Sequence, residues 1–251
     1  MPEAEQKVKY VILPFKEAIE YFRKKGLKVS EASWKEFKQQ VQVRSFTVAH
    51  VTQMDILVDI KSAVDKAISS GQSLGEFKKG LRDTLTKKGW YAPKGEKAKI
   101  KMPDGTIRKR LTGWRLETIY NTNLQTAYSA GRYKQMMEST REHWQYRAIL
   151  DSGTRPDHEA QNGKIYHRDH PFWDTWYPPN GFGCRCDVVT LSERQMEKRG
   201  LKEEMKGTDL KPDEGWRYNP GRVSLDKWQP DLERYPKELS EQYKREKPIF
   251  D

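Results

Sequence analysis

Cysteine is scarce in this chain, which has two in 251 residues, Cys184 and Cys186, with one residue between them. Two cysteines at this spacing exclude the disulfide framework of a small secreted domain, and a disulfide between them would be geometrically strained. We therefore expect the protein to be made and kept in a reducing cytosol, or in an assembly that forms there.

Long apolar segments are absent as well. Hydrophobic residues make up 35% of the chain and charged residues 33%. The first residues hold no apolar signal core, and no run approaches the ~20 apolar residues that a membrane helix needs. These absences predict no membrane partner, and the high polar content predicts an elongated molecule with arms rather than a compact enzyme.

Positive charge, in contrast, is in excess. The chain has 47 basic and 36 acidic residues, which give a net charge of +11. Such a balance favours polyanionic partners, of which nucleic acid is the commonest. A soluble basic protein with no specific ligand would have the same composition, so both interpretations stay open at this stage.

Residues 94–115 concentrate this charge, with eight basic and two acidic residues and a net charge of +6. Their alternating pattern around Pro103-Asp104-Gly105 predicts two short strands joined by a turn. The segment, here called the basic hairpin, is either a solvated face or an arm that contacts phosphates. For the second interpretation the candidate nucleic-acid-binding residues are Lys97, Lys99, Lys101, Arg108, Lys109 and Arg110.

Apolar residues recur at helical spacing through the first ninety residues. Capping boxes at Ser33–Glu36 and Ser73–Glu76 each precede such a run. The clearest apolar stripe consists of Leu57, Ile60, Val64 and Ile68. Further along the chain we expect a long helix from about Gly113 through Glu138, strands at 144–150 and 188–190, and a capped helix from Ser192. From Thr208 onward, prolines forbid long helices, and Trp216, Trp228 and Tyr235 are predicted to anchor an extended tail.

Residues 151–186, here called the Cys/His loop, contain both cysteines and three of the five histidines. Zinc needs about four thiolate or imidazole ligands held tetrahedrally. The candidate metal ligands are His158, Cys184, Cys186 and, as the fourth, His170, with His167 or Asp151 as substitutes for it. In the metal-free alternative, His158 hydrogen-bonds Asp151 and the cysteines are small buried apolar residues. In both cases we expect His158, Cys184 and Cys186 to converge, covered by Trp173 and Trp176.

A charge-assisted contact is expected to hold the long helix against this loop. Arg132 lies late on the predicted helix and Asp151 begins the loop, so the two could form an ion pair. In the alternative, Arg155 pairs with Asp151 and Arg132 faces solvent.

Several motifs in this half of the chain carry a family resemblance. They occur in the order Asn121-Thr-Asn123, Tyr128-x-x-Gly131-Arg132, Trp144-x-Tyr146-x-Ala148-Ile149-x-Asp151, Thr154-Arg-Pro-x-His158, Pro178-Pro-Asn-Gly and Cys184-Arg-Cys186. The ordered set resembles the Mu F-like minor head proteins of tailed bacteriophages, also called head morphogenesis proteins, best between about Leu116 and Leu191. Many relatives have Cys-x-x-Cys where this chain has Arg155-Pro-Asp-His158, and a histidine where it has Asn180, which leaves fewer thiol ligands here.

The resemblance implies a structural minor capsid protein that acts inside the phage head, near the portal or the inner capsid wall. Its implied partners are the portal protein, the major capsid protein or both, together with packaged phage DNA. It would be found in the virion, and in the host cytoplasm during assembly.

We accordingly expect an α+β fold with a mostly helical body, a small sheet, the projecting basic hairpin, the Cys/His loop and an extended C-terminal tail. The expected regions are an N-terminal helical region (1–93), the basic hairpin (94–115), the Mu F-like core (116–207) and the tail (208–251).

The alternative to a structural role is a phage-encoded enzyme delivered with the DNA, such as a metal-dependent nuclease or an NAD-dependent transferase. His158, Asn162 and His167 occur in the order of an HNH nuclease, but their spacing is too short for the strand–turn geometry of that motif. For a transferase we find neither an acidic pair nor a glycine-rich phosphate loop. Nucleophilic catalysis by cysteine would need an orienting partner that the motif does not supply. We therefore predict no catalytic residue.

Overall fold

The computed structural model describes residues 15–29 and 45–222. The predicted capping box at Ser33–Glu36 and the tail beyond residue 222, with Trp228 and Tyr235, lie outside the described residues. The described part is α+β, as expected from the sequence. Its helices are α1 (Lys16–Arg23), α3 (Met54–Ser70), α4 (Leu74–Lys87), α5 (Gly113–Glu138), α6 (Pro156–Glu159), α7 (Phe172–Trp176), α8 (Glu193–Arg199) and the 3-10 helix η2 (Pro220–Arg222). Its strands are β1 (Gly26–Leu27), β2 (Ser45–Phe46), β3 (Lys99–Lys101), β4 (Ile107–Lys109), β5 (His143–Arg147), β6 (Ile165–His167) and β7 (Asp187–Leu191).

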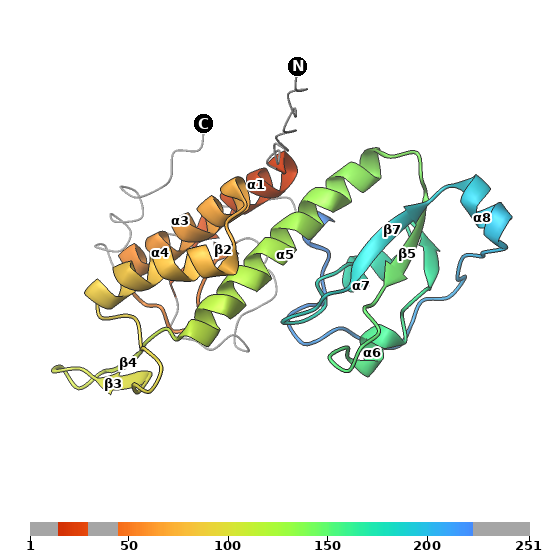
Figure 1. The fold of residues 1–251 in the computed structure, drawn as a ribbon. Helices are drawn as coiled ribbons and strands as arrows, with labels where there is room; N and C mark the ends of the chain where they lie inside the picture. The colour runs from red at the N-terminus through yellow and green to blue at the C-terminus, as the bar shows by residue number, and fades with distance from the viewer. Residues whose placement is uncertain (1–14, 30–44, 223–251) are drawn as a thin grey trace, which may run out of the picture.

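Helices α1, α3 and α4 pack with the first part of α5 to form a helical lobe (Figure 1). The predicted stripe on α3 is buried in its core, because Leu57, Ile60 and Val64 each have no exposed surface. Gly71 ends α3 in the left-handed conformation that favours glycine, at φ 67°. Ser73 and Glu76 then form the predicted capping box of α4, which is confirmed.

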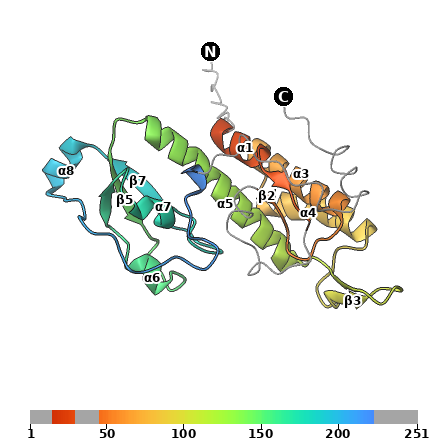
Figure 2. The ribbon, with the colours of Figure 1, turned by 180° about the vertical axis from the view of Figure 1, so that it is seen from behind.

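Helix α5 belongs to two cores. It has 26 residues, which corresponds to a length of about 39 Å. Ala127 and Ala130 face the core of the helical lobe, whereas Tyr133 and Met136 face a second, largely aromatic core. Figure 2 shows the helical elements and the sheet on opposite sides of this helix, which gives the described part an elongated shape.

Residues 132–222 form the second lobe, here called the sheet lobe, around an antiparallel sheet of order β6-β5-β7. The strands expected at 144–150 and 188–190 are found at 143–147 and 187–191, in the register Gln145 to Val189. Trp144 on the central strand is fully buried. The described end of the chain crosses this lobe, since Trp176 donates to the carbonyl of Leu210 (3.1 Å) and η2 packs on α5.

The basic hairpin contains the two expected strands. β3 and β4 pair antiparallel, with Lys99 opposite Lys109 and Lys101 opposite Ile107. The pair lies at the end of the helical lobe, beyond α4 and the start of α5 (Figure 1). Among the described residues, we find no helix that combines the length and the apolar character needed to cross a membrane.

Candidate functional site

The structure brings His158, Cys184 and Cys186 together, as predicted. The three potential ligand atoms lie within 4.8 Å of one another. His158 Nδ1 is 3.8 Å from the sulfur of Cys184 and 3.5 Å from that of Cys186. All three residues are buried, with exposures of 2%, 2% and 8%. We refer to them as the Cys2His cluster.

Local structure explains how each member of the cluster is positioned. His158 lies on α6, a single helical turn whose first residue is Pro156, where proline costs no hydrogen bond. Both cysteines lie just before β7, and Arg185 between them is exposed. The predicted cover is present in part, because the ring of Trp176 meets the His158 ring edge-on at 5.9 Å.

The two sulfurs differ in their electrostatic surroundings. A hydrogen bond from Cys186 is the main influence that lowers the pKa of Cys184, to about 5, and it outweighs the opposing effect of burial. His158 and the backbone N–H groups of Asn180 and Cys186 lower it further. The same contact with Cys184, together with burial, raises the pKa of Cys186. Cys184 is therefore the sulfur on which negative charge is favoured.

A small cavity opens beside the cluster. It has a volume of about 10 Å³ and is bordered by Gly153, Gly183 and the side chains of Arg155 and Arg185 as well as by the cluster itself. This volume corresponds to roughly one water molecule. His158 Nε2, on the other side of the ring, is buried without a hydrogen-bond partner among the described residues.

His170, the expected fourth ligand, is not in the cluster. Its ring lies 4.7 Å from that of Tyr166, and its Nδ1 accepts a hydrogen bond from the backbone N–H of Phe172 (3.0 Å). His167, one of the two substitutes, lies 3.5 Å from Asp169. Asp151, the other, is bound by Arg185 at 2.7 Å, which lowers the pKa of Asp151 to about 2. The metal-free interpretation predicted a hydrogen bond from His158 to Asp151, and this prediction is therefore wrong.

Both expectations for Arg132 were also wrong. Arg132 pairs with Asp187 at the start of β7 (2.5 Å) and donates to the carbonyl of Val188. Arg155 pairs with Asp213 (3.0 Å). The long helix is thus held against the Cys/His loop region by an ion pair, but the partner is the carboxylate next to Cys186. The antiparallel pairing of β5 and β7 determines this, because it brings Asp187 rather than Asp151 alongside α5.

The three residues with HNH-like order serve separate contacts. His158 faces the sulfurs, whereas Asn162 accepts a hydrogen bond from the backbone N–H of Ala148 (2.9 Å). His167 lies between Glu142 and Asp169. The three side chains therefore do not converge on a single site.

A model of the family described as Phage Mu protein F like protein matches residues 58–189. The chain belongs to this family. The match runs from α3 through the basic hairpin and α5 to β7, and it includes all three residues of the Cys2His cluster.

Two named relatives are similar to the chain over most of its length. One is the F protein of Escherichia phage Mu, named as an inferred capsid assembly protein, which is 38% identical over 248 residues, covering 85% of this chain and 55% of that protein. The other is the Mu-like prophage FluMu F protein of Haemophilus influenzae, 42% identical over 172 residues, covering 68% of this chain and 40% of that protein. The chain spans about half the length of these relatives. No solved structure matches it.

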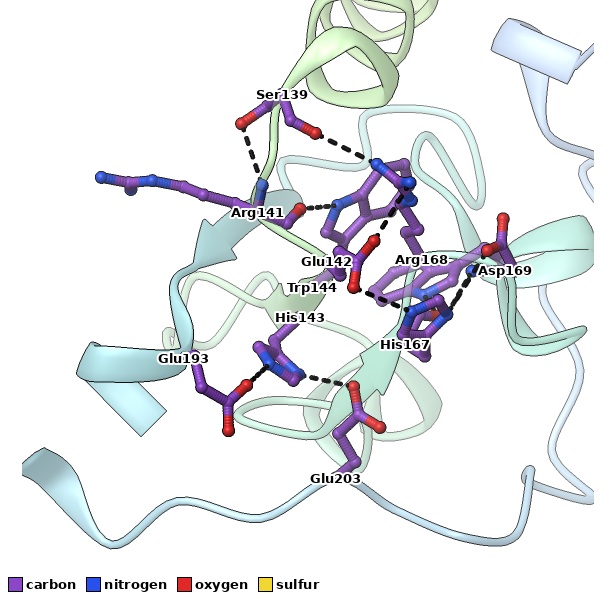
Figure 3. Close-up of polar contacts among 11 residues, drawn as sticks. Ser139, Arg141, Glu142, His143, Trp144, His167, Arg168, Asp169, Glu193 and Glu203 are labelled. Atoms are coloured by element: carbon purple, nitrogen blue, oxygen red, sulfur yellow. Dashed lines mark hydrogen bonds and ion pairs between the residues drawn. The ribbon is translucent and has the colours of Figure 1, made fainter. Parts of the chain in front are cut away.

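Within this Mu F-like chain, the structure shows a second polar cluster that sequence reasoning missed. His143 at the start of β5 lies between two carboxylates, with Glu193 at 2.6 Å and Glu203 at 2.7 Å (Figure 3). Burial lowers the pKa of His143, but the hydrogen bonds to Glu203 and Glu193 outweigh it and raise the pKa overall. His143 therefore links β5 to α8 and to the segment that follows α8. No local signal could have revealed this, because Glu203 is 60 residues away in sequence.

The candidate phosphate-binding residues of the basic hairpin divide into two groups. Lys97, Lys99 and Lys101 are exposed. The other three are partly buried and have partners within the protein. Arg108 lies over the Trp90 ring (5.0 Å), Lys109 contacts His50 (3.2 Å), and Arg110 donates to Glu96 (2.9 Å). Arg110 also donates to the carbonyls of Tyr91 and Lys97, so it holds the loop that leads into β3.

Proposed function

We propose that this Mu F-like chain is a minor structural protein required for assembly of the head of a tailed bacteriophage. The observation that carries the proposal is its family membership, with a match over 58–189 and a relative at 38% identity whose name refers to capsid assembly.

The finer part of the proposal is that the chain acts inside the head, beside the portal or the inner capsid wall, with the portal protein or the major capsid protein as partner. Its net charge of +11 supports a position close to packaged DNA. The two-lobe shape along α5 supports a role in bridging neighbouring components, since an elongated molecule presents separate surfaces (Figure 1).

The role in assembly can be tested by deleting the coding sequence from a phage that carries it and supplying the chain in trans. Without the chain we expect lysates to contain few DNA-filled heads, and we expect the wild-type chain to restore them. Electron microscopy and a count of infectious particles measure this, and mass spectrometry of purified heads tests whether the chain is incorporated. A normal yield of infectious particles in its absence would contradict the proposal.

We further propose that Lys97, Lys99 and Lys101 contact the DNA backbone. The side chains of these lysines are exposed and have no hydrogen bond or ion pair within the described part of the chain, whereas Arg110 makes three such contacts. Changing all three lysines to glutamine should weaken DNA binding and reduce the slope of log affinity against log salt by up to ~3, because each lost phosphate contact releases about one counterion fewer.

The matched control changes three exposed lysines of the sheet lobe, Lys198, Lys202 and Lys206, to glutamine. It removes the same charge and should leave most of the salt slope in place. Binding isotherms over a salt series measure both variants. Equal loss in the two variants would show that net charge alone, rather than the basic hairpin, determines DNA binding.

A further inference from the structure

We propose that the Cys2His cluster is a zinc site in which His158, Cys184 and Cys186 supply three ligands and a solvent molecule in the adjoining cavity supplies the fourth. The proposal is independent of the role in head assembly. It replaces His170 as the expected fourth ligand, because the structure places that side chain against Tyr166.

The spacing of the ligand atoms already fits a metal. With zinc–sulfur bonds of about 2.3 Å and a zinc–nitrogen bond of about 2.0–2.1 Å, tetrahedral geometry separates sulfur from nitrogen by about 3.5 Å. His158 Nδ1 lies 3.5 Å from the sulfur of Cys186 and 3.8 Å from that of Cys184. All three atoms are within 4.8 Å of one another, so binding requires only small adjustments.

The hydrogen-bonding capacity of the cluster also favours a cation. A neutral imidazole has one acceptor nitrogen, so Nδ1 can accept from one thiol but not from two. Both sulfurs approach this one nitrogen, at 3.8 Å for Cys184 and 3.5 Å for Cys186. A bound cation would instead contact all three buried atoms at once, and two sulfurs with one imidazole nitrogen are ligands that zinc prefers.

Each of the two neighbouring arginines already has a carboxylate partner. Arg185 is paired with Asp151 and Arg155 with Asp213. A divalent cation bound by two thiolates would balance the charge of the cluster locally, and any proton still held by the sulfurs would be released to solvent on binding.

The cavity beside the cluster has room for the fourth zinc ligand. All three cluster residues line it together with Gly153 and Gly183, and its volume of about 10 Å³ suits a single water. Zinc sites with three protein ligands typically hold water in the fourth position. The metal would connect α6 to the segment just before β7 and so close the loop between His158 and Cys184, which are 26 positions apart.

The experiment starts from the full chain purified without chelator. We expect the purified protein to contain about one equivalent of zinc per chain, as measured by elemental mass spectrometry. After exchange with Co²⁺ we expect thiolate-to-cobalt charge-transfer absorption and the d–d bands of a tetrahedral site. An added small thiol should shift these bands, because it replaces the solvent ligand. A chain that binds neither Zn²⁺ nor Co²⁺ would overturn the proposal.

Variants then test each ligand against a matched control. Cys184→Ser, Cys186→Ser and His158→Ala should each weaken Zn²⁺ binding by more than ~100-fold, beyond the effect of a second-shell change. His170→Ala should bind like the wild type, and loss of zinc in that variant would overturn the three-ligand assignment. If a cysteine variant does not fold, the site is tested in the wild-type protein by removing and restoring the metal. Removal of zinc by a chelator should lower its melting temperature and added Zn²⁺ should restore it, whereas an unchanged melting temperature would count against the site.

Discussion

Replacing Gly131 by alanine is expected to destabilise the protein by about 1–3 kcal/mol, although alanine is the better helix former. A Cβ atom at this position would lie 2.8 Å from the backbone nitrogen of Ala18 and 2.8 Å from Cζ of Phe15. Because the first of these is backbone, α1 would have to move away from α5. Chemical denaturation of the variant and the wild type measures the effect.

Gly80 on α4 provides the control. A Cβ atom there meets nothing within 4 Å, so Gly80→Ala should stabilise the protein by up to ~1 kcal/mol through helix propensity alone. Opposite signs for the two changes would show that Gly131 is required for the close approach of α1. If Gly131→Ala also proved stabilising, the packing of α1 on α5 would be incorrect.

Replacing Trp144 by alanine should have a still larger effect, a loss of about 3–5 kcal/mol in the free energy of unfolding. Trp144 lies on the central strand with no exposed surface, and its ring contacts Tyr133 at 5.5 Å and Trp173 at 5.7 Å. The substitution would leave a cavity between α5 and the sheet. The same denaturation measurement applies, with tryptophan fluorescence and circular dichroism followed together.

Trp114→Ala is the matched control for this prediction, because the Trp114 side chain is 73% exposed. Its removal should change stability by less than ~0.5 kcal/mol, as expected of a surface position. A similar cost for the two changes would indicate that Trp114 is buried in an assembly of the chain in solution.

Helix α5 couples the stability of the two lobes. Helix α5 contributes Ala127 and Ala130 to one core and Tyr133 and Met136 to the other, so a change on either face is expected to affect both lobes. The Arg132–Asp187 pair lies between α5 and the Cys2His cluster. Metal binding in the Cys/His loop would therefore stiffen the same end of the helix.

Some of the fold could be predicted from the sequence because the signals are local. The apolar stripe of α3 and the capping box of Ser73 and Glu76 depend on residues three or four apart, and both were found where expected. The hairpin strands followed from alternation around a turn. The convergence of His158 with the cysteines was also predictable, because residues that bind soft metals are concentrated in one short stretch of the chain.

Tertiary structure alone decided the partners of the charged residues. Asp151 binds Arg185, 34 residues away, and Arg132 binds Asp187, 55 residues away. Such pairs depend on the strand register of β5 and β7 and on how α5 crosses the sheet, and no local pattern encodes either. The position of His170 also depends on tertiary packing. The sequence predicts it as a metal ligand, but its ring packs against Tyr166 and lies outside the Cys2His cluster. The sequence therefore determined the family, the helices and the chemistry of the loop, whereas packing over long separations determined which of its polar groups meet.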